Sequence, residues 1–385
     1  MKRIDDQPWL NAPATQAVCA AVTADGAQVL FVGGCVRNAL LGEPVSDMDI
    51  ATDALPDQVM ELAARAGIKA IPTGIDHGTV TLVKNGVPHE ITTFRKDVAT
   101  DGRRAVVAFS KDIAEDARRR DFTMNAIYAR PDGGIVDPLG GMDDLKRRRV
   151  RFIGTAQHRI REDYLRSLRY FRFHAWYGNH AEGFDPDALA AIAANLDGLQ
   201  TLSKERVGAE VLKLLAAPDP APSAAAMRQA GVLAQVLPGA DDRALAPLIH
   251  LESGRPVSAL RRLAALGGDG LQEALRLSKA QASHLQAIRA AAAGTAGAGE
   301  LGYRLGAEQA LDALLLRSAL LEQPVLPNLE TDITLGVKAV FPVKARDLLP
   351  EFKGPELGAK LRKLEADWIA SGFSLSREQL LDSLR

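Results

Sequence analysis

The chain has 385 residues, of which 47% are apolar and 25% charged, and its net charge is −1 at pH 7. This length exceeds what one hydrophobic core usually supports, so we expect more than one globular domain. Two cysteines, Cys19 and Cys35, are too few for a disulfide framework, and no apolar run approaches the ~20 residues that span a bilayer. The sequence therefore argues against a disulfide-rich secreted protein and against membrane contact, and we expect a cytoplasmic protein.

The first part of the chain mixes strand-like and helix-like patterns. Runs rich in β-branched residues, such as QVLFV, GTVTLV, HEITTF and RAVVAF, alternate with a helical pattern in ALPDQVMELAARAG. This mixture predicts an α/β or α+β domain over residues 15–152.

A glycine pair follows the first of these runs. Gly33 and Gly34 precede CVRNALLG, which has helical character. Glycines let the backbone approach a ligand closely, and the free amides at a helix start bind phosphate well. Arg37, one turn into the helix, could reach the same anion. An ordinary turn is the alternative interpretation.

Two carboxylates flank one residue shortly afterwards. If SDMDI forms a strand, Asp47 and Asp49 project from the same face. Two carboxylates so close repel each other unless a divalent cation lies between them, as in two-metal phosphoryl-transfer sites. Glu90, in the strand-like HEITTF, is a candidate third carboxylate, with an exposed edge-strand residue as the alternative.

The segment RRRDFTMNAIYA, residues 118–129, lies in a region where Lys and Arg outnumber Asp and Glu. Its side chains Arg119, Arg120, Asp121 and Asn125 can bond ribose hydroxyls and phosphates. The local positive charge suits a polyanionic ligand. A helix cap at Asp121 or Thr123 is the alternative.

Beyond about residue 153, strand-like runs nearly vanish and Ala/Leu/Arg-rich segments predict successive helices. In RIREDYLRSLRYFRFHA, one helix would place Asp163 and Arg166 at i and i+3, with Arg169 on the same stripe. Asp only accepts and Arg only donates hydrogen bonds, so the pair complements the Watson–Crick edges of cytosine and adenine and rejects guanine and uracil. A surface ion pair is the alternative.

Six segments in this order resemble bacterial class II CCA-adding tRNA nucleotidyltransferases and their poly(A) polymerase relatives: GGCVRNALLG, SDMDI, HEITTFR, RRRDFTMNAIYA, DPLGGMDDL and REDYLRSLRYFRF. The resemblance implies a polymerase β-like α+β nucleotidyltransferase head at residues 15–152. It also implies an all-α remainder, with a base- and RNA-binding neck (153–235), a body (236–325) and a tRNA-binding tail (326–385).

The resemblance further implies template-independent addition of CCA to the 3′ end of tRNA from CTP and ATP, with release of pyrophosphate. Asp47 and Asp49 would bind two Mg²⁺ ions, with Glu90 as the third carboxylate of the catalytic set. The implied nucleotide-binding residues are Gly33, Gly34 and Arg37 at the triphosphate, Arg120, Asp121 and Asn125 at the ribose, Asp163 and Arg166 at the base, and Arg169 beside them. Asn38 departs from the family, which more often has Asp there.

The implied partners are the 3′ end and acceptor arm of tRNA, with CTP and ATP as substrates and no DNA. Poly(A) polymerases typically carry a Gly-Arg-Arg/Lys-Phe run before the third carboxylate, which IPTGIDHGTVTLV lacks. The loop DVATDGRRAVVAFSKD favours complete CCA addition. Poly(A) synthesis, partial C or A addition, and tRNA binding without catalysis stay open as alternatives.

Overall fold

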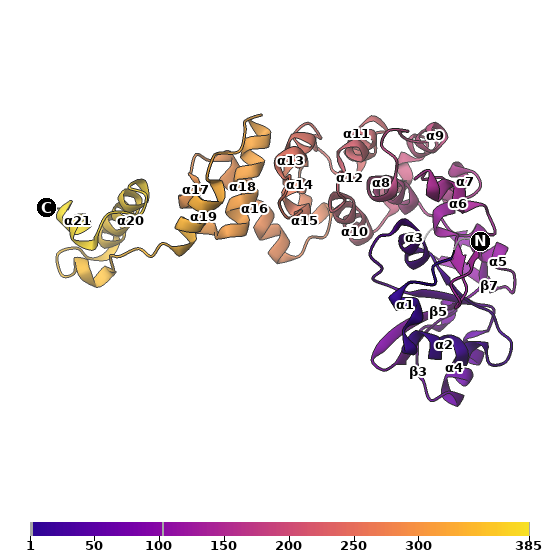
Figure 1. Cartoon of the computed structure of the whole chain (residues 1–385). Helices are drawn as coiled ribbons and strands as arrows, with labels where there is room; N and C mark the ends of the chain where they lie inside the picture. The colour runs from indigo at the N-terminus through magenta and orange to yellow at the C-terminus, as the bar shows by residue number, and fades with distance from the viewer. Residues whose placement is uncertain (1–2, 102–103, 385) are drawn as a thin grey trace. The chain divides into compact units, whose positions relative to one another are not determined.

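The computed structural model describes residues 3–101 and 104–384. The chain divides into two compact units (Figure 1). The first comprises Met1–Glu210 with Pro222–Val236, and the second comprises Val211–Ala221 with Leu237–Arg385. Within the described ranges, none of the helices combines the length and apolarity needed to cross a bilayer. The four-domain division and the cytoplasmic location stay predictions.

A mixed sheet forms the centre of the first unit. Over the described residues it has seven strands in the order β3-β4-β5-β2-β1-β8-β9, in which β2 and β5 are parallel and the other neighbours antiparallel. The strands are β1 (Val29–Val32), β2 (Asp49–Thr52), β3 (Lys69–Gly74), β4 (Thr79–Lys84), β5 (Val87–Thr93), β8 (Tyr128–Ala129) and β9 (Ile135–Val136). The strands expected from QVLFV, GTVTLV and HEITTF are confirmed.

Two helices, α2 (Pro13–Thr23) and α4 (Pro56–Arg65), contact β4, β5 and each other, and so cover one face of the sheet (Figure 1). In β4, Val80 and Leu82 are fully buried and alternate with more exposed residues, as a strand with one covered face requires. The helix predicted in ALPDQVMELAARAG is α4. Shorter helical elements complete the head: α1 (Pro8–Asn11), α3 (Gly34–Leu41), η1 (Ile75–His77), α5 (Ile113–Arg118), η2 (Thr123–Asn125) and α6 (Gly141–Lys146).

The segment between Glu90 and RRRDF, described as a loop that contains the strand-like run RAVVAF, is largely a hairpin, and the RAVVAF strand is confirmed. β6 (Arg95–Asp101) and β7 (Arg104–Phe109) pair antiparallel as a separate two-stranded sheet. At its base the amide of Ser110 donates to the carbonyl of Phe94 at 2.8 Å. Residues 102–103 at the tip lie outside the described residues.

The single helix expected over residues 159–175 is wrong. Instead α7 (Ala156–Glu162) ends before Asp163, and α8 (Leu165–Tyr177) begins after it. Asp163 is extended, with φ −155° and ψ 106°, and its Oδ1 accepts from the amide of Leu165 at 3.1 Å. An Asp that bonds the backbone two residues ahead offers an alternative to the helical hydrogen bond, which is the physical reason for the break.

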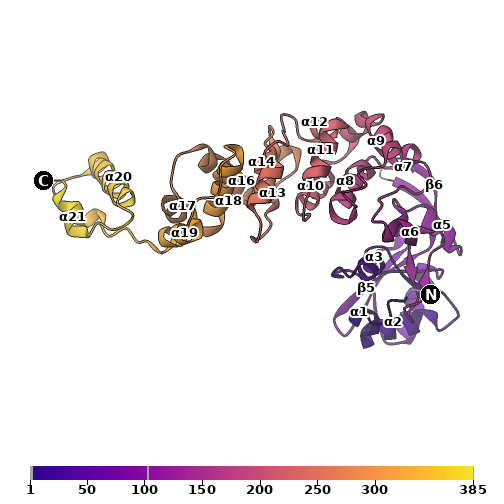
Figure 2. The ribbon, with the colours of Figure 1, turned by 45° about the horizontal axis from the view of Figure 1, so that its top comes forward.

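Helices form the rest of the first unit. Figure 2 shows α7, α8 and α9 (Pro186–Ala193) beside one another. They are followed by η3 (Leu196–Thr201), α10 (Lys204–Leu215), α11 (Ala221–Gln229) and α12 (Val232–Val236), of which α10 and α11 contribute residues to both units.

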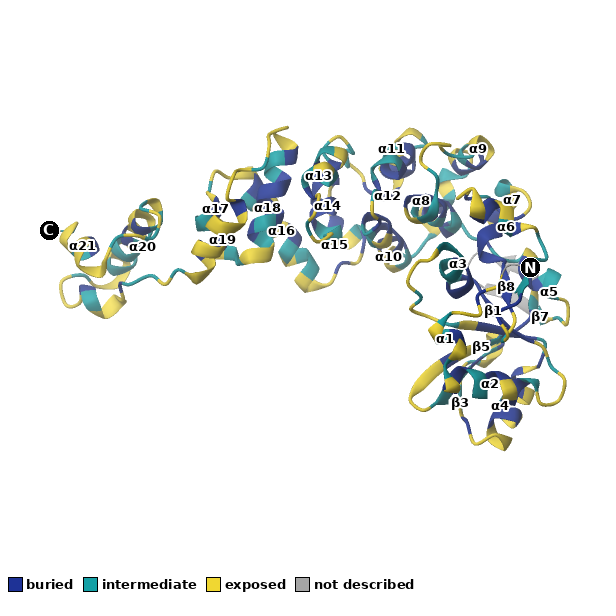
Figure 3. Ribbon diagram, in the orientation of Figure 1, coloured by how far each residue is buried: buried dark blue, intermediate teal, exposed yellow. Residues whose placement is uncertain are grey.

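The second unit is helical throughout its described residues. Its elements are α13 (Leu245–Leu251), α14 (Ala259–Leu266), α15 (Leu271–Ala274), α16 (Lys279–Ala293), α17 (Ala298–Leu305), α18 (Ala307–Leu320), α19 (Leu329–Lys338), η4 (Ala345–Leu348), α20 (Gly354–Ala370) and α21 (Arg377–Asp382). Much of α18 is buried (Figure 3). A smaller core surrounds Trp368 of α20. The Trp368 ring contacts the Tyr303 ring of α17 edge to face, with 5.5 Å between the ring centres. The successive helices expected beyond about residue 153 are therefore confirmed.

Candidate nucleotide-binding site

The glycine pair forms the turn between β1 and α3. Gly33 has φ +77°, a left-handed conformation that glycine adopts without steric cost. A Cβ atom at this position would lie 3.7 Å from Nη1 of Arg120 and 3.9 Å from Oδ2 of Asp49. The turn therefore brings bare backbone between a guanidinium and a carboxylate, at the start of a helix whose free amides suit an anion.

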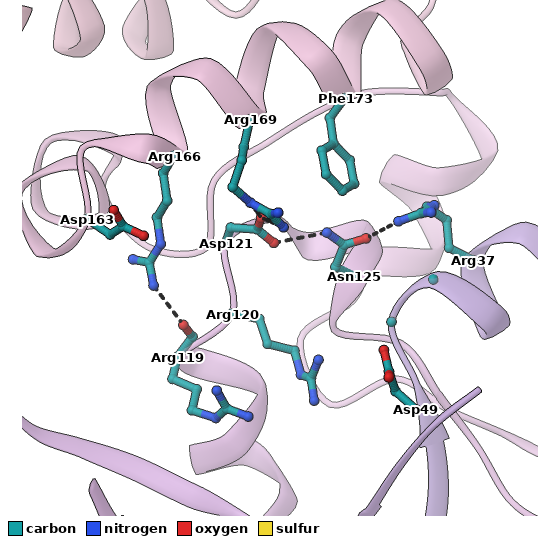
Figure 4. A pocket seen from close by; sticks show the side chains of 12 residues that line it. Arg37, Asp49, Arg119, Arg120, Asp121, Asn125, Asp163, Arg166, Arg169 and Phe173 are labelled. Carbon is teal, nitrogen blue, oxygen red and sulfur yellow. Dashed lines mark hydrogen bonds and ion pairs between the residues drawn. The ribbon is translucent and has the colours of Figure 1, made fainter. Parts of the chain in front are cut away.

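A cavity of about 330 Å³ opens beside this turn (Figure 4). Its lining contains every residue that the sequence nominated for nucleotide binding, together with Asp49. It also contains Arg119, which lies in the same basic segment, and Phe173, which the sequence did not single out. The lining residues are Gly33, Gly34, Arg37, Asp49, Arg119, Arg120, Asp121, Asn125, Asp163, Arg166, Arg169 and Phe173. Asp47 and Glu90 do not line the cavity.

The three carboxylates expected to be catalytic nevertheless lie close together, on or just before two neighbouring interior strands. Asp49 on β2 pairs in parallel register with Glu90 on β5, and Asp47 lies just before β2. Desolvation raises the pKa of Asp49; Arg120 opposes that shift and the charge of Asp47 adds to it. Desolvation and the charge of Asp49 likewise raise the pKa of Glu90, opposed by Arg95. The repulsion among these groups is the kind that a divalent cation relieves.

The donor atoms here are all carboxylate oxygens, which suits a hard divalent cation. Among the described residues, the ligand atoms of these three side chains do not form a compact group. Over residues 3–101 and 104–384, the compact group of potential ligands is a different one, His284, Glu308 and Asp312. Asp312 already pairs with Arg261 at 2.6 Å, so its charge is offset and a cation gains little there.

Arg37 is buried and held by protein on all three nitrogens. Nη1 donates to Oδ1 of Asn125 at 2.6 Å, Nη2 donates to the Tyr177 hydroxyl at 2.8 Å, and Nε and Nη2 donate to Oδ1 of Asn38 at 3.1 and 2.9 Å. Its guanidinium also lies 4.0 Å from the centre of the Tyr177 ring. Asn38, where the family more often has Asp, therefore accepts from Arg37 without neutralising its charge.

A continuous polar chain runs along the wall of the cavity (Figure 4). From Arg37 it passes to Asn125, whose Nδ2 donates to Oδ1 of Asp121 at 2.9 Å. Arg169 on α8 donates from Nε to Oδ2 of Asp121 at 2.7 Å. Burial opposes the ionisation of Asp121, but Arg169 and Asn125 outweigh it and lower its pKa. Asp121 also accepts a hydrogen bond from the amide of Phe122. The same carboxylate therefore stabilises the local turn and lines the cavity.

The predicted base-reading pair reaches the cavity from two different elements. Asp163 lies in the break between α7 and α8, and its Oδ2 accepts from Nη2 of Arg206 on α10 at 2.7 Å. Arg166 on α8 donates to the carbonyls of Arg159 at 3.0 Å and Arg119 at 3.1 Å. Asp163 thus pairs with Arg206, and the surface ion pair with Arg166 that the sequence left open is not formed.

The sequence did not point to Asp116, Tyr128 and Arg206. These residues do not line the cavity but bond to side chains that do. Asp116 precedes Arg119 and Arg120 by three and four residues and pairs with both. That helical spacing in EDARRRD was a readable signal. Nothing in the sequence alone connected Arg206 with Asp163, 43 residues away, or Tyr128 with Arg120, because neither pair has the spacing of neighbours on one helix or strand.

The mixed sheet, the glycine turn and the neighbouring carboxylates of Asp47, Asp49 and Glu90 define a nucleotidyltransferase head. Residues 29–151 match the family model described as the poly A polymerase head domain. Residues 183–243 match a second model, described as the probable RNA and SrmB-binding site of polymerase A.

Individual relatives narrow the assignment. The chain is 41% identical over 216 residues to a CCA-adding enzyme of Geobacillus thermodenitrificans, covering 56% of this chain and 52% of that protein. It is 43% identical over 189 residues to the human mitochondrial CCA tRNA nucleotidyltransferase 1, covering 49% of this chain and 44% of that protein. The chain spans about half the length of the curated relatives it matches.

The fold is similar to that of the Bacillus stearothermophilus CCA-adding enzyme in complex with CTP, with a TM-score of 0.72, 29% identity and coverage of 93% of both chains. Residues 29–151 therefore form a nucleotidyltransferase head of the poly A polymerase family, and the chain as a whole is similar to bacterial-type CCA-adding enzymes. The predicted fold class, a nucleotidyltransferase head followed by helices, is confirmed. Dependence on a divalent metal ion is a property of this family.

Proposed function

We propose that this protein adds CCA to the 3′ end of tRNA, using CTP and ATP and releasing pyrophosphate. The observation that carries the proposal is the single cavity that joins the glycine turn and Asp49 to Asp163 and Arg166. It thereby combines a place for phosphate with a donor and an acceptor for a base. The names of the relatives, CCA-adding enzyme and CCA tRNA nucleotidyltransferase, support this choice of substrates.

Asp47 and Asp49 are the residues proposed to hold Mg²⁺, with Glu90 on the neighbouring strand facing the incoming tRNA end. Mg²⁺ bound there would supply Lewis acidity, activating the 3′ hydroxyl and stabilising charge at the α-phosphate. The amides at the start of α3 would hold the triphosphate, and the positive charge of Arg37 and Arg120 would favour its approach.

Base choice falls to Asp163 and Arg166. Asp163 accepts one hydrogen bond on each oxygen from protein, and each oxygen keeps further acceptor capacity. Arg166 also pairs through Nη1 with Glu162, and it keeps N–H groups on Nε and Nη2 beyond those that hold Glu162 and the Arg119 and Arg159 carbonyls. The pair can therefore present an acceptor and a donor to cytosine or adenine, whereas guanine and uracil would face like groups. Asp121, Asn125 and Arg169 would lie at the ribose.

Poly(A) synthesis is the second candidate, because the family model that matches residues 29–151 is named for poly A polymerase. One assay separates the candidates. Purified protein is incubated with Mg²⁺, each labelled nucleotide and tRNA that lacks its last three nucleotides. Ordered addition of C, C and A that stops after three supports the proposal, long A tails support poly(A) synthesis, and no incorporation supports tRNA binding without catalysis.

A further inference from the structure

We propose that Asp116 and Tyr128 form a positioning pair that fixes the guanidinium groups of Arg119 and Arg120 in the nucleotide cavity. Asp116 lies on α5 and Tyr128 on β8, and both are buried, with 1% and 0% of their surface exposed. Neither lines the cavity, whereas Arg119 and Arg120 do. The pair therefore acts through the two arginines. This inference rests on the proposed function for the identity of the nucleotide.

Arg120, Tyr128 and Asp116 are joined pairwise by three hydrogen bonds, which form a closed ring. The Tyr128 hydroxyl donates to Oδ2 of Asp116 at 2.7 Å, and Nη2 of Arg120 donates to the same oxygen at 3.0 Å. Nε of Arg120 donates to the Tyr128 hydroxyl oxygen at 3.2 Å. The hydroxyl thus serves as acceptor for the arginine and donor to the carboxylate, which a phenylalanine cannot reproduce.

The ring leaves one end of Arg120 for a ligand. Two of its three nitrogens are held by the pair, and the third, Nη1, lies 3.7 Å from where a Cβ of Gly33 would be. Figure 4 shows the Arg120 side chain extending toward Asp49 at the glycine turn. A guanidinium fixed at two nitrogens loses little further rotamer freedom when its third binds an anion, so less of the interaction energy is lost on ordering.

Asp116 also holds Arg119, through its other oxygen. Oδ1 accepts from Nε of Arg119 at 2.8 Å, while the carbonyl of Arg119 accepts from Arg166 at 3.1 Å. One buried carboxylate therefore serves two cavity arginines, and the group of three keeps a net positive charge, which suits a triphosphate. Burial opposes the ionisation of Asp116, but Arg120 and Arg119 outweigh it and lower its pKa to about 2.

A purely structural role for Tyr128 can be separated from positioning. Its ring belongs to the buried cluster that includes Val32 and Phe94, so the ring packs independently of the hydroxyl. Tyr128→Phe removes the hydroxyl and keeps the ring. Tyr170→Phe is the matched control, because Tyr170 is also fully buried and its hydroxyl accepts from the Asp185 amide at 2.9 Å, outside the cavity lining.

The test uses the full chain and measures CTP binding by calorimetry, kcat and KM on tRNA lacking CCA, and thermal unfolding. We expect Tyr128→Phe to raise Kd and KM for CTP about 3- to 10-fold, the effect of losing about one hydrogen bond, with a smaller change in kcat. Asp116→Asn should weaken CTP binding further. Tyr170→Phe should leave Kd for CTP unchanged.

Unchanged CTP binding in Tyr128→Phe, or an equal loss in Tyr170→Phe, would overturn the positioning role. If Asp116→Asn does not fold, the comparison of Tyr128→Phe with Tyr170→Phe tests the positioning role by itself. A parent protein that binds CTP but adds no CCA would refute the proposed function, while the comparison of Kd values would still decide the positioning role. Loss of CTP binding by the parent protein itself would overturn both.

Discussion

Oδ2 of Asp163 accepts a hydrogen bond from Nη2 of Arg206 at 2.7 Å, so the proposed base-reading carboxylate is held by a residue 43 positions away on α10. Asp163 lies outside any helix, and its backbone therefore does not fix the direction of its side chain as a helix would. Arg206 supplies that restraint together with the Leu165 amide, which bonds the other carboxylate oxygen. The selectivity of the cavity should thus depend on a side chain that does not line it.

Replacing Arg206 with Met tests this dependence. The variant keeps an unbranched side chain but loses the ion pair, so Asp163 can rotate away from the base. We expect discrimination of CTP against UTP to fall about 10-fold, equivalent to roughly 1.4 kcal/mol of differential transition-state binding. The measurement is kcat/KM for each nucleotide on tRNA lacking CCA. Full discrimination in Arg206→Met, matching an Arg304→Met control in the second unit, would contradict the prediction.

Asp49→Asn should lower incorporation by more than about 10³-fold, because the amide keeps the shape of the side chain but removes a proposed ligand of Mg²⁺. tRNA binding should persist, since positive charge and shape dominate RNA affinity. Single-turnover incorporation and a filter-binding assay measure the two quantities. Asp57→Asn, at an exposed position in the first turn of α4, is the control. Substantial turnover by Asp49→Asn would remove Asp49 from the metal site.

The second unit contains a buried ionic network whose disruption should be costly. Glu252 accepts from Nε of Arg261 at 2.6 Å and from Nε of Arg262 at 2.8 Å, and all three side chains are at most 3% exposed. Glu252→Gln leaves two buried guanidinium groups short of a charge. We expect a loss of about 3 to 5 kcal/mol in the free energy of unfolding, measured by urea denaturation of the full chain.

The matched control for this loss is Glu300→Gln. Glu300 pairs with Arg304 at 2.8 Å on the surface of α17, where such a pair contributes under about 1 kcal/mol. Equal losses in the two variants would mean that burial does not set the strength of the Glu252 network.

His174 should make the stability of the first unit sensitive to acid. Burial lowers the pKa of His174 to about 4, and Nε2 lies 3.0 Å from the Gly183 carbonyl. The ring also stacks on Phe184 and on His180. The unfolded chain takes up this proton near pH 6.5. Between these pH values the unfolded state binds more protons, so acidification favours unfolding.

The expected size of this effect is about 3 kcal/mol between pH 7 and pH 4. The parent protein and His174→Gln should therefore differ less in their free energy of unfolding at pH 4 than at pH 7. His158→Gln, at a largely exposed histidine, should show no such narrowing. A pH-independent difference for His174→Gln would show that the buried ring is not responsible.

The local parts of this site could be predicted from the sequence. The glycine pair Gly33-Gly34 followed a strand-like run, Glu90 lay in another such run, and Arg120, Asp121 and Asn125 belonged to a basic segment. These features depend on neighbouring residues in the chain. Periodicity and turn chemistry express such dependence directly. The prediction of one helix over residues 159–175 was wrong because the Asp163 side chain competes with the backbone for the Leu165 amide.

What the sequence alone determined is the inventory of chemical groups and the elements that carry them: a glycine turn, paired carboxylates, a basic segment and a helical second half. Only the tertiary structure decided which groups meet. Parallel pairing of β2 with β5 brought Glu90 beside Asp49, and packing of α8 and α10 brought Arg169 to Asp121 and Arg206 to Asp163. Those contacts join residues 41 to 48 positions apart, and their energies depend on burial and orientation, which no local pattern in the chain encodes.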